Sequence, residues 1–322
     1  MKILKNRLKK LAQQIFISSS VQVRQDIDAK MLTRLYVRKC QLTDHILHCK
    51  ESGVISQKYA DCDIIVSLTT YGVRIHEVAF TIESLMQQTM KANRIILWLD
   101  ESFKEKQLPH SLLLQQKRGL EISFCPDIRS YKKLIPQLQR TPNDAIVTVD
   151  DDIIYDYDFL EHLIHAYLDN PQVIHSCRIH RIGLNKEGII IPYSEWEKEC
   201  VETGINPLNF LTGCGGVLYP PGCFDQEVFN KKVYLTICPY ADDIWFTAMA
   251  IYSGTPINKV FTRNKHGEDF LFNSHVQGEK LVYKNITLKG NDSQLQAVFT
   301  KYSLFDKLRA NIDNSEWRKD HN

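Results

Sequence analysis

The segment Ala145-Ile-Val-Thr-Val-Asp-Asp-Asp-Ile-Ile-Tyr155 decides the fold of this chain. Its first half, residues 145–149, is apolar and mostly β-branched and is too short for a helix, which predicts a buried strand. Three consecutive carboxylates follow it directly, Asp150, Asp151 and Asp152. At about 4 Å and an effective dielectric constant of about 20, one pair of like charges costs about 4 kcal/mol. A hard divalent cation, Mn²⁺ or Mg²⁺, is the simplest compensation, because oxygen ligands suit these ions.

A turn between the strand and the next helix is the alternative interpretation of these acids. In such a turn one aspartate caps the helix by accepting a hydrogen bond from its first backbone N–H groups. A cap uses a single aspartate and leaves the other two without a role. We therefore favour the cation site.

The composition indicates a large α/β domain. With 322 residues, 43% of them hydrophobic, the chain can bury a sizeable core. The net charge of +2 gives no reason to expect a nucleic-acid partner. The nine cysteines include no C-x-x-C pair, which argues against a disulfide framework or zinc site and favours a reducing cytoplasm. There is no apolar run of about 18 residues and no signal-peptide pattern, so we expect a cytoplasmic protein.

The N-terminal segment differs from the rest in its charge. Residues 1–40 contain ten Lys or Arg and two acids, a net charge of +8, which leaves −6 for the remainder. Two basic amphipathic helices are predicted, one over Leu4–Ile15 and one around Met31–Tyr36. This basic helical extension, residues 1–60, could anchor the protein peripherally on an anionic membrane leaflet. The alternative is an extension that is solvated, or packed on the main domain or on a second subunit; the oligomeric state stays open.

Strands and helices alternate from residue 63 onward. This alternation predicts a mainly parallel sheet with right-handed crossovers, flanked by helices. Ligands bind such sheets at the carboxyl ends of the strands, where polar clusters occur at 69–74, 127–133 and 150–152. The expected strands are 64–70, 94–99, 121–124 and 145–149, and the expected helices are 78–86, 112–118, 131–140 (bent or shortened by Pro136) and 158–168.

The second half of the chain is less regular. We expect a strand over 173–180, a loop-like segment over 181–210, and a helix over 239–252 that opens with acids. Six motifs then stand in a distinctive order along the chain: Ser67–Arg74, Arg129–Leu134, Val149–Asp152, Gly215–Tyr219, Ala241–Trp245 and Asn291–Asp292.

This order resembles the GT-A glycosyltransferases that use nucleotide sugars, in particular bacterial enzymes that build capsule or lipopolysaccharide side chains. The resemblance covers about residues 63–302. It implies a GT-A (Rossmann-like) glycosyltransferase domain over 61–305, followed by a C-terminal tail over 306–322.

The resemblance also implies the donor site. The loop after the first strand would hold the base and ribose of the nucleotide. The cluster near residue 130 would lie near the base and the diphosphate, where a lysine contributes a point charge. The donor-binding residues implied in this way are Thr69, Thr70, Tyr71, Arg74, Asp127, Lys133, Asp150 and Asp151.

Asp152 is implied as the direct ligand of Mn²⁺ or Mg²⁺, with Asp150 reaching the ribose or, through water, the ion. The run of three acids leaves the choice among them open. Many relatives add a C-terminal histidine, for which His266 is favoured over His275. An isolated histidine is otherwise a surface or packing residue.

Asp243 is implied as the general base, with Asp242 as its competitor, and a base there implies single displacement with inversion. The alternative is that one of these acids caps a helix. Gly215 and Gly216 would line the acceptor side, because glycine permits close backbone approach, or would form an ordinary tight turn. Trp245 would stack on an acceptor sugar or lie in the core.

The expected function is therefore metal-dependent transfer of a sugar from a nucleoside-diphosphate sugar, preferably a UDP-sugar, to a hydroxyl of a glycan or glycolipid acceptor in surface polysaccharide synthesis. One alternative is a haloacid-dehalogenase-type phosphatase with Asp150 as nucleophile and Asp152 as acid. About three strands precede the motif, whereas that family places it after the first, and Ile154 stands where the family prefers Thr or Val. The other alternative is a nucleotide-sugar-binding or scaffold protein without catalysis.

Overall fold

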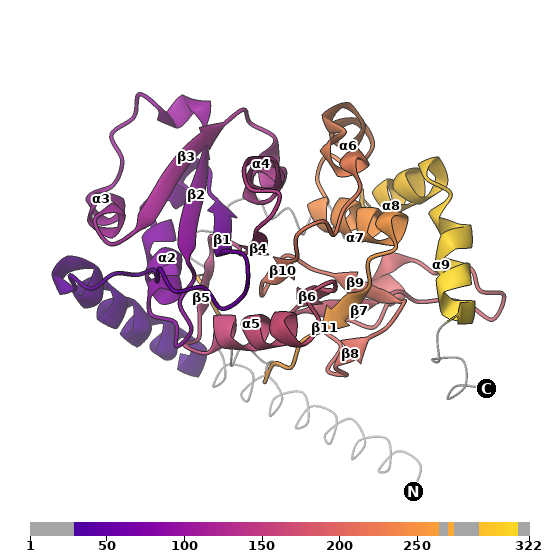
Figure 1. Ribbon diagram of the computed structural model, residues 1–322, viewed down its shortest axis with the longest axis horizontal. Coiled ribbons are helices and arrows are strands. Elements are labelled where there is room, and N and C mark those ends of the chain that lie inside the picture. Colours follow the sequence, from indigo (N-terminus) through magenta and orange to yellow (C-terminus); the bar gives the residue numbers. More distant parts are fainter. Residues whose placement is uncertain (1–28, 264–269, 274–289, 315–322) are drawn as a thin grey trace, which may run out of the picture.

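The computed structural model describes residues 29–263, 270–273 and 290–314. Its main feature is an eight-stranded sheet with the strand order β3-β2-β1-β4-β10-β6-β11-β8 (Figure 1). The first four strands in this order are parallel, β10 is antiparallel to both β4 and β6, and β11 is parallel to β6. The strands are β1 (Ile64–Thr69), β2 (Arg94–Asp100), β3 (Leu120–Cys125), β4 (Ala145–Thr148), β6 (Ile174–Ser176), β8 (Gly204–Ile205), β10 (Val217–Tyr219) and β11 (Ile257–Lys259).

Helices cover both faces of this sheet, because its central strands are apolar on both sides. In β4, Val147 belongs to the hydrophobic cluster under α2, α3 and α5, whereas Ile146 belongs to the cluster under α4, α7, α8 and α9. The predicted α/β fold, a mainly parallel sheet flanked by helices, is confirmed. The helices are α2 (Val78–Met86), α3 (His110–Gln116), α4 (Ile135–Arg140), α5 (Phe159–Asp169), α6 (Lys231–Ile237), α7 (Asp242–Ser253), α8 (Gly290–Lys301) and α9 (Leu304–Asn314).

Two predicted elements, the helix over 131–140 and the strand over 173–180, are each split into two shorter elements in the structure. The helix expected over 131–140 is split into a 3₁₀ turn, η3 (Arg129–Lys133), and α4, with Pro136 in the first turn of α4 as its missing N–H allows. The strand expected over 173–180 is split into β6 and β7 (Ile179–Arg181), and β7 pairs with β9 (Asn209–Leu211) in a separate sheet. The segment 181–210, expected to be loop-like, therefore includes short strands.

Three strands, β1, β2 and β3, precede β4 in the chain, as expected. The observation that counted against a dehalogenase-type phosphatase therefore holds. The acids are followed by β5 (Ile153–Tyr155), which pairs with β12 (Phe270–Phe272) more than a hundred residues later. Such a non-local pairing of three-residue strands leaves no signal in the local pattern.

Residues 29–48 form a helix, as predicted around Met31–Tyr36. Leu35 and Leu42 on one side of this helix are buried against Ile154 of β5. The segment after residue 28 therefore packs on the α/β domain, which is the alternative that the sequence left open. The helix predicted over Leu4–Ile15 lies outside the described residues.

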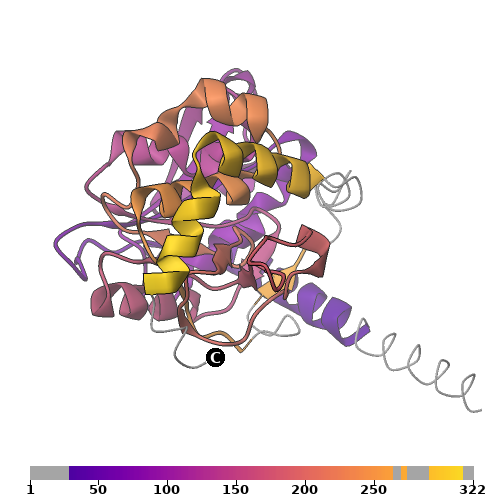
Figure 2. The same cartoon turned by 90° about the vertical axis from the view of Figure 1, so that its right-hand side faces the viewer.

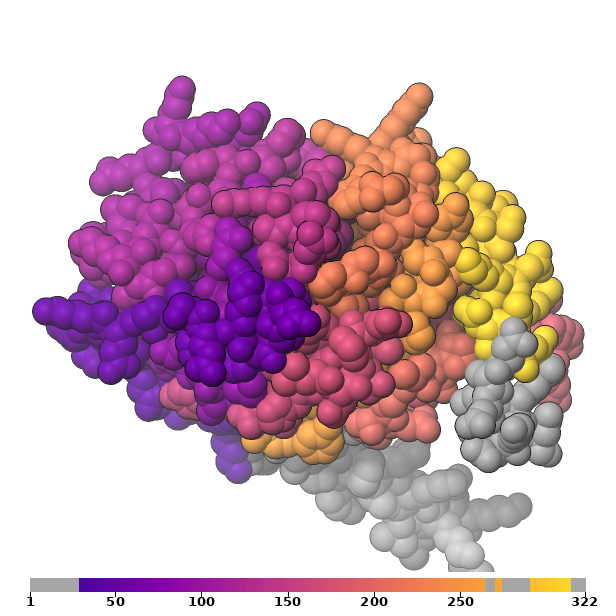
Figure 3. Space-filling view, viewed as in Figure 1, coloured from indigo at the N-terminus to yellow at the C-terminus, as the bar shows by residue number. Residues whose placement is uncertain are grey.

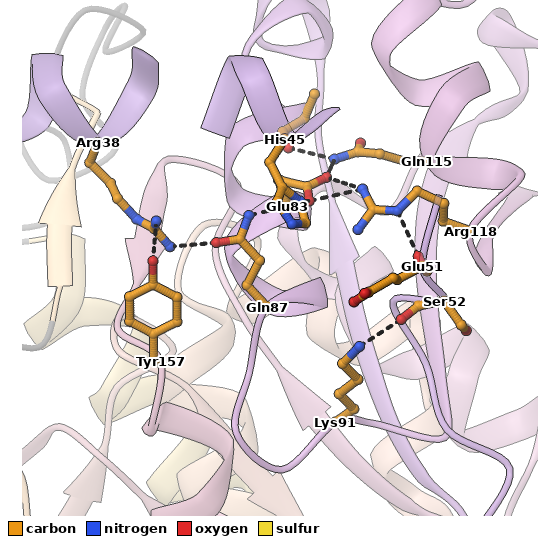
Figure 4. A network of polar contacts seen from close by, with 11 residues as sticks. Arg38, His45, Glu51, Ser52, Glu83, Gln87, Lys91, Gln115, Arg118 and Tyr157 are labelled. Atoms are coloured by element: carbon orange, nitrogen blue, oxygen red, sulfur yellow. Dashed lines mark hydrogen bonds and ion pairs between the residues drawn. The ribbon is translucent and has the colours of Figure 1, made fainter. Parts of the chain in front are cut away.

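A polar network joins the same helix to α2 and α3 (Figure 4). His45 lies 2.5 Å from the carboxylate of Glu83, which also accepts hydrogen bonds from Arg118 at 2.9 Å and Gln115 at 3.0 Å. Glu83 is fully buried, so this carboxylate depends on all three partners.

At the other end of the described chain, α8 and α9 pack against α7 (Figure 2). Leu304, Leu308 and Ile312 of α9 are buried in the same cluster as Trp245. The packing of the domain thus continues past residue 305, where we expected the tail to begin. None of the described helices has the length and apolar character needed to cross a bilayer.

Candidate functional site

Asp150 lies just past the carboxyl end of β4, the strand between β1 and β10. Its backbone N–H donates to the phenolic oxygen of Tyr155 at 3.1 Å, which ties the acidic turn to β5. The carboxylate of Asp150 is 30% exposed and is open to a ligand. The acids therefore lie at the sheet edge at which the sequence predicted a site.

Asp151 and Asp152 share one cation, Arg74. The guanidinium donates to Asp151 Oδ1 at 2.5 Å and to Asp152 Oδ2 at 2.8 Å, and the hydroxyl of Thr70 donates to Asp151 Oδ2 at 2.5 Å. Thr70 and Arg74 follow β1, and Ser67 of β1 is the register partner of Thr148 in β4. The parallel pairing of the two strands thus brings the predicted donor loop against the acids.

Lys133, at the end of η3, bridges two segments that are far apart in the sequence. Its ammonium nitrogen lies 2.9 Å from Asp150 Oδ1 and 3.2 Å from Asp242 Oδ2. Its backbone carbonyl accepts a hydrogen bond from Ser67 Oγ at 2.6 Å, which fixes the lysine over the sheet edge. Burial alone would lower its pKa, but the carboxylates of Asp150, Asp242 and Asp243 outweigh burial and raise the pKa well above its usual value. The ammonium is therefore charged at neutral pH.

Asp242 and Asp243 form the first turn of α7. The N-cap is Ala241, with no side-chain hydrogen bond, so the alternative in which either aspartate caps the helix is wrong. Asp243 Oδ1 instead accepts the backbone N–H of Gly213 at 2.9 Å. Burial, then the charge of Asp242, raises the pKa of Asp243 to about 7, although Lys133 acts in the opposite direction.

Gly213 makes this arrangement possible. A Cβ at this position would lie 2.5 Å from Lys133 Nζ and 3.0 Å from Asp243 Oδ1. A side chain here would require the Lys133 ammonium to move and would crowd the Asp243 carboxylate. The sequence analysis did not single out Gly213, because the glycine pair that follows it was the more obvious motif.

The charges of the site do not balance. Among the residues that the structure describes, five aspartates (150, 151, 152, 242 and 243) lie beside two cations, Arg74 and Lys133. This leaves a net charge of −3 when all five acids are ionised. The protein's own cations thus offset part of the repulsion that the sequence argument assigned entirely to a metal ion. The remaining excess favours a further cation.

The donor set fits a metal ion that is shared with a ligand. Among the described residues, no group of three or more His, Cys, Asp or Glu side chains converges to hold a metal ion by itself. Mg²⁺-type sites for nucleotides characteristically use one or two carboxylates and take their other ligands from phosphates and water. Asp150 and Asp152 fit that pattern: both are partly exposed, and burial, then the charge of Asp150, raises the pKa of Asp152.

A polar chain connects Asp152 to the N-terminal helix. The backbone carbonyl of Asp152 accepts the N–H of Asn273 at 2.8 Å, and the Asn273 side chain donates to Glu77 Oε2 at 2.9 Å. The same Glu77 oxygen lies 2.6 Å from the ammonium of Lys39. The helix over 29–48 therefore helps to hold the acidic turn in place.

Some predicted donor residues are occupied by other contacts. The hydroxyl of Thr69 donates to the backbone carbonyl of Trp98 at 2.8 Å, so it serves the β1–β2 pairing. Tyr71 is 50% exposed, and its ring lies 5.1 Å from the guanidinium carbon of Arg74. Tyr71 is thus placed beside the acids with a face open to solvent.

Two predicted residues have side-chain partners other than the acids of the site. Asp127 pairs with Lys132 at 2.5 Å, and not with Lys133. Trp245 is fully buried, and its indole N–H donates to the carbonyl of Val228 at 3.1 Å. The prediction that Trp245 contacts an acceptor is wrong, and the alternative, a core residue, is what the structure contains.

Gly215 and Gly216 form the turn that leads into β10. Both have positive φ, +89° and +97°, and a Cβ on Gly216 would meet the ring of Phe159 at 2.4 Å. Because β10 pairs with β4, this turn lies next to the start of the acidic run. Backbone conformation and packing are sufficient reasons for glycine here. His266 and His275 lie outside the described residues.

The structure adds residues that the sequence analysis missed. Arg178, just after β6, pairs with Glu199 at 2.5 Å. Burial raises the pKa of the Cys214 thiol to about 12, the positive charge of Arg178 opposes this, and the charges of Asp150 and Asp152 add to it. Arg178 and Cys214 therefore border the acids. The expected strand over 173–180 included Arg178, so no feature of the sequence indicated that this residue lies past the carboxyl end of β6.

No protein-family model matches this chain, and no curated protein matches it. Among solved structures it is similar to a CMP:2-keto-3-deoxy-manno-octonic acid synthetase complexed with CTP, at 11% identity and a TM-score of 0.40, over 72% of this chain and all of that one. It is also similar to TarS residues 1–349 of S. aureus, at 16% identity and a TM-score of 0.42, over 63% of this chain and 58% of that one. At these identities and TM-scores, neither structure supports a conclusion about the function of this chain.

Proposed function

We propose that this protein is a metal-dependent glycosyltransferase that moves a sugar from a nucleoside-diphosphate sugar, preferably a UDP-sugar, to a hydroxyl of a glycan or glycolipid acceptor in surface polysaccharide synthesis. The observation that carries the proposal is the bridge made by Lys133. Through it the acid at the end of β4 and the acids at the start of α7 become one site. A donor group and a base for the acceptor must meet in this way for sugar transfer.

The acidic turn is the proposed donor side. Asp152, with Asp150, would hold Mn²⁺ or Mg²⁺ together with the diphosphate of the donor. Such an ion, when bound, supplies positive charge where negative charge develops on the departing nucleoside diphosphate. Lys133 is close enough to Asp150 to contribute a second positive charge to the same group. The exposed ring of Tyr71, beside Thr70 and Arg74, offers a surface for the base or ribose.

Asp243 is the proposed general base. A base works best when its pKa lies near the working pH, and burial raises the pKa of Asp243 to about 7. The acceptor hydroxyl gives its proton to Asp243 while its oxygen forms a bond to the anomeric carbon. The bond from that carbon to the phosphate oxygen breaks, and its electron pair leaves with the diphosphate. A single displacement of this kind inverts the anomeric configuration.

The acceptor side and the cellular location belong to the same proposal. Gly215 and Gly216 lie beside the start of the acidic run and would line the space for the acceptor. We infer that the enzyme works in the cytoplasm at the inner face of the membrane, where residues 1–40 contact anionic lipids, because glycolipid acceptors are held there.

The test is a thermal-shift screen of nucleotide sugars with and without Mn²⁺, followed by an assay for release of nucleoside diphosphate. A ligand of the native state raises the melting temperature by mass action. We expect a shift that needs both Mn²⁺ and a nucleotide sugar, lost in Asp152→Ala and kept in Asp306→Ala, whose exposed carboxylate lies on α9. Full transfer activity in Asp152→Ala would refute the metal assignment. Binding without release of diphosphate by any acceptor would favour a binding protein without catalysis.

A further inference from the structure

A groove runs between the N-terminal helix and the β5–β12 pair, on a part of the molecule that the proposed transfer does not use. Its volume is about 310 Å³, and its lining includes Arg34, Val37, Arg38, Ile154, Tyr157 and Leu271. Apolar side chains thus form its inner wall, while two arginines come from the helix.

The helix beside this groove exposes apolar side chains. Leu32 is 51% exposed and Tyr36 is 72% exposed. They are four residues apart and therefore lie on one side of the helix. Val37, on the groove side, is 49% exposed. The space-filling view shows the first part of the described chain, in indigo, at the molecular surface (Figure 3).

Basic residues are interleaved with these apolar side chains. Lys30, Arg34, Arg38 and Lys39 lie on the helix, which has no acid between residues 29 and 43. The guanidinium of Arg38 donates to the hydroxyl of Tyr157 at 2.6 Å and to Gln87 at 3.0 Å (Figure 4), so it is held at the groove. Among the described residues that line the groove, Asp156 is the one acid.

The chain that precedes this helix has the same sign of charge. Residues 1–28 contain six Lys or Arg and two acids. A positively charged face with exposed leucine and tyrosine side chains complements a bilayer with anionic headgroups, which offers phosphates to arginines and an apolar layer below them. A soluble polyanion would satisfy the charges and leave Leu32 and Tyr36 in water.

We propose that the exposed face of the helix over 29–48, together with the groove beside it, is the docking surface for an anionic phospholipid bilayer. Arg34 and Arg38 contact lipid phosphates there, and Leu32, Tyr36 and Val37 enter the headgroup layer. The docking proposal rests on the proposed function in one respect: it identifies the surface through which the glycosyltransferase would reach the membrane. Because Leu35 and Leu42 hold the helix on the domain, docking also sets the orientation of the acidic turn relative to the bilayer.

The experiment measures binding of the full chain to sedimented vesicles, without any sugar transfer. Vesicles of phosphatidylcholine with phosphatidylglycerol are compared with vesicles of phosphatidylcholine alone. The test variant is Lys30→Gln with Arg34→Gln, which leaves the buried side of the helix intact. The matched control is Lys231→Gln with Lys232→Gln on α6, far from the N-terminal helix (Figure 1).

We expect the wild type to bind only the anionic vesicles. Each basic residue at such a surface contributes about 1 kcal/mol, so the test variant binds about 30-fold more weakly while the control binds like the wild type. Leu32→Ser with Tyr36→Ser should reduce the binding that persists at high salt. Circular dichroism and melting temperature establish that each variant is folded.

Equal binding of the test variant and the control would overturn the proposal, as would a wild type that ignores anionic vesicles. A second copy of the chain is the rival occupant of this surface. If Leu32→Ser with Tyr36→Ser converts a dimer to a monomer in light scattering and leaves vesicle binding unchanged, the face is a dimer interface. A chain that binds vesicles but transfers no sugar would leave the docking surface standing and refute the transferase.

Discussion

Replacement of Lys133 by methionine tests the physical basis of the site. The lysine ammonium lies 2.9 Å from Asp150 Oδ1 and 3.2 Å from Asp242 Oδ2, so the two carboxylate oxygens are no more than about 6 Å apart. At an effective dielectric constant of about 20, their repulsion without the lysine is about 3 kcal/mol. This agrees with the loss of about 3–5 kcal/mol found when one partner of a buried ion pair is removed.

The assay is urea denaturation at pH 8, together with the melting temperature. We expect Lys133→Met to lose about 3 kcal/mol of unfolding free energy and roughly 6–9 °C in melting temperature. Added Mn²⁺ should recover more stability in the variant than in the wild type, because a bound divalent ion replaces the missing charge.

Lys132→Met is the matched control. Lys132 is as buried as its neighbour, but its partner Asp127 is 63% exposed and stays hydrated when the lysine is removed. A surface pair of this kind contributes about 1 kcal/mol or less. Equal losses in the two variants, or a Lys133→Met protein that does not respond to Mn²⁺, would refute the view that Lys133 neutralises a shared acidic site.

Four further predictions concern the start of α7 and the loop before β10. Asp243→Asn should reduce kcat by about 10²–10⁴-fold with little change in the dissociation constant of the donor; a weakened donor affinity with turnover intact would place Asp243 on the donor side instead. Because burial raises the pKa of Asp243 to about 7, kcat of the wild type should rise with pH through about 7 and then level off, as a pH–rate profile would reveal. Between about pH 4 and 7 the Asp243 carboxyl keeps its proton in the native state and loses it in the unfolded state, so the unfolding free energy should fall as pH rises through this range. In urea titrations Asp243→Asn should show a smaller fall. Identical pH profiles of the unfolding free energy in the variant and the wild type would contradict the conclusion that burial raises this pKa. Gly213→Ala should cost about 1–3 kcal/mol, because its Cβ would lie 2.5 Å from Lys133 Nζ and must displace the ammonium; a chemical denaturation curve like that of the wild type would mean that the lysine moves without cost.

The sequence determined the elements whose signal is local. Residues 145–149 are apolar and β-branched and form β4 with only its last residue outside the strand, because a buried parallel strand needs apolar side chains on both faces. The same rule placed the acids at the carboxyl end of that strand and the Thr70–Arg74 loop beside them. Asp242 and Asp243 were correctly placed at the start of a helix, since acids are favourable in a first turn.

The tertiary structure alone decided how these acids are neutralised. A pattern of residues cannot tell that Lys133 reaches Asp150 and Asp242, or that Lys132 points to Asp127 instead, because adjacent side chains in a 3₁₀ turn diverge and their partners come from distant segments. Likewise the sequence alone allows Trp245 to be either a binding-site aromatic or a core residue. It is buried because α8 and α9 pack over α7. Local sequence sets which side chains are present and on which element, whereas the pairing of charges and the burial of faces depend on contacts between segments that only the folded chain brings together.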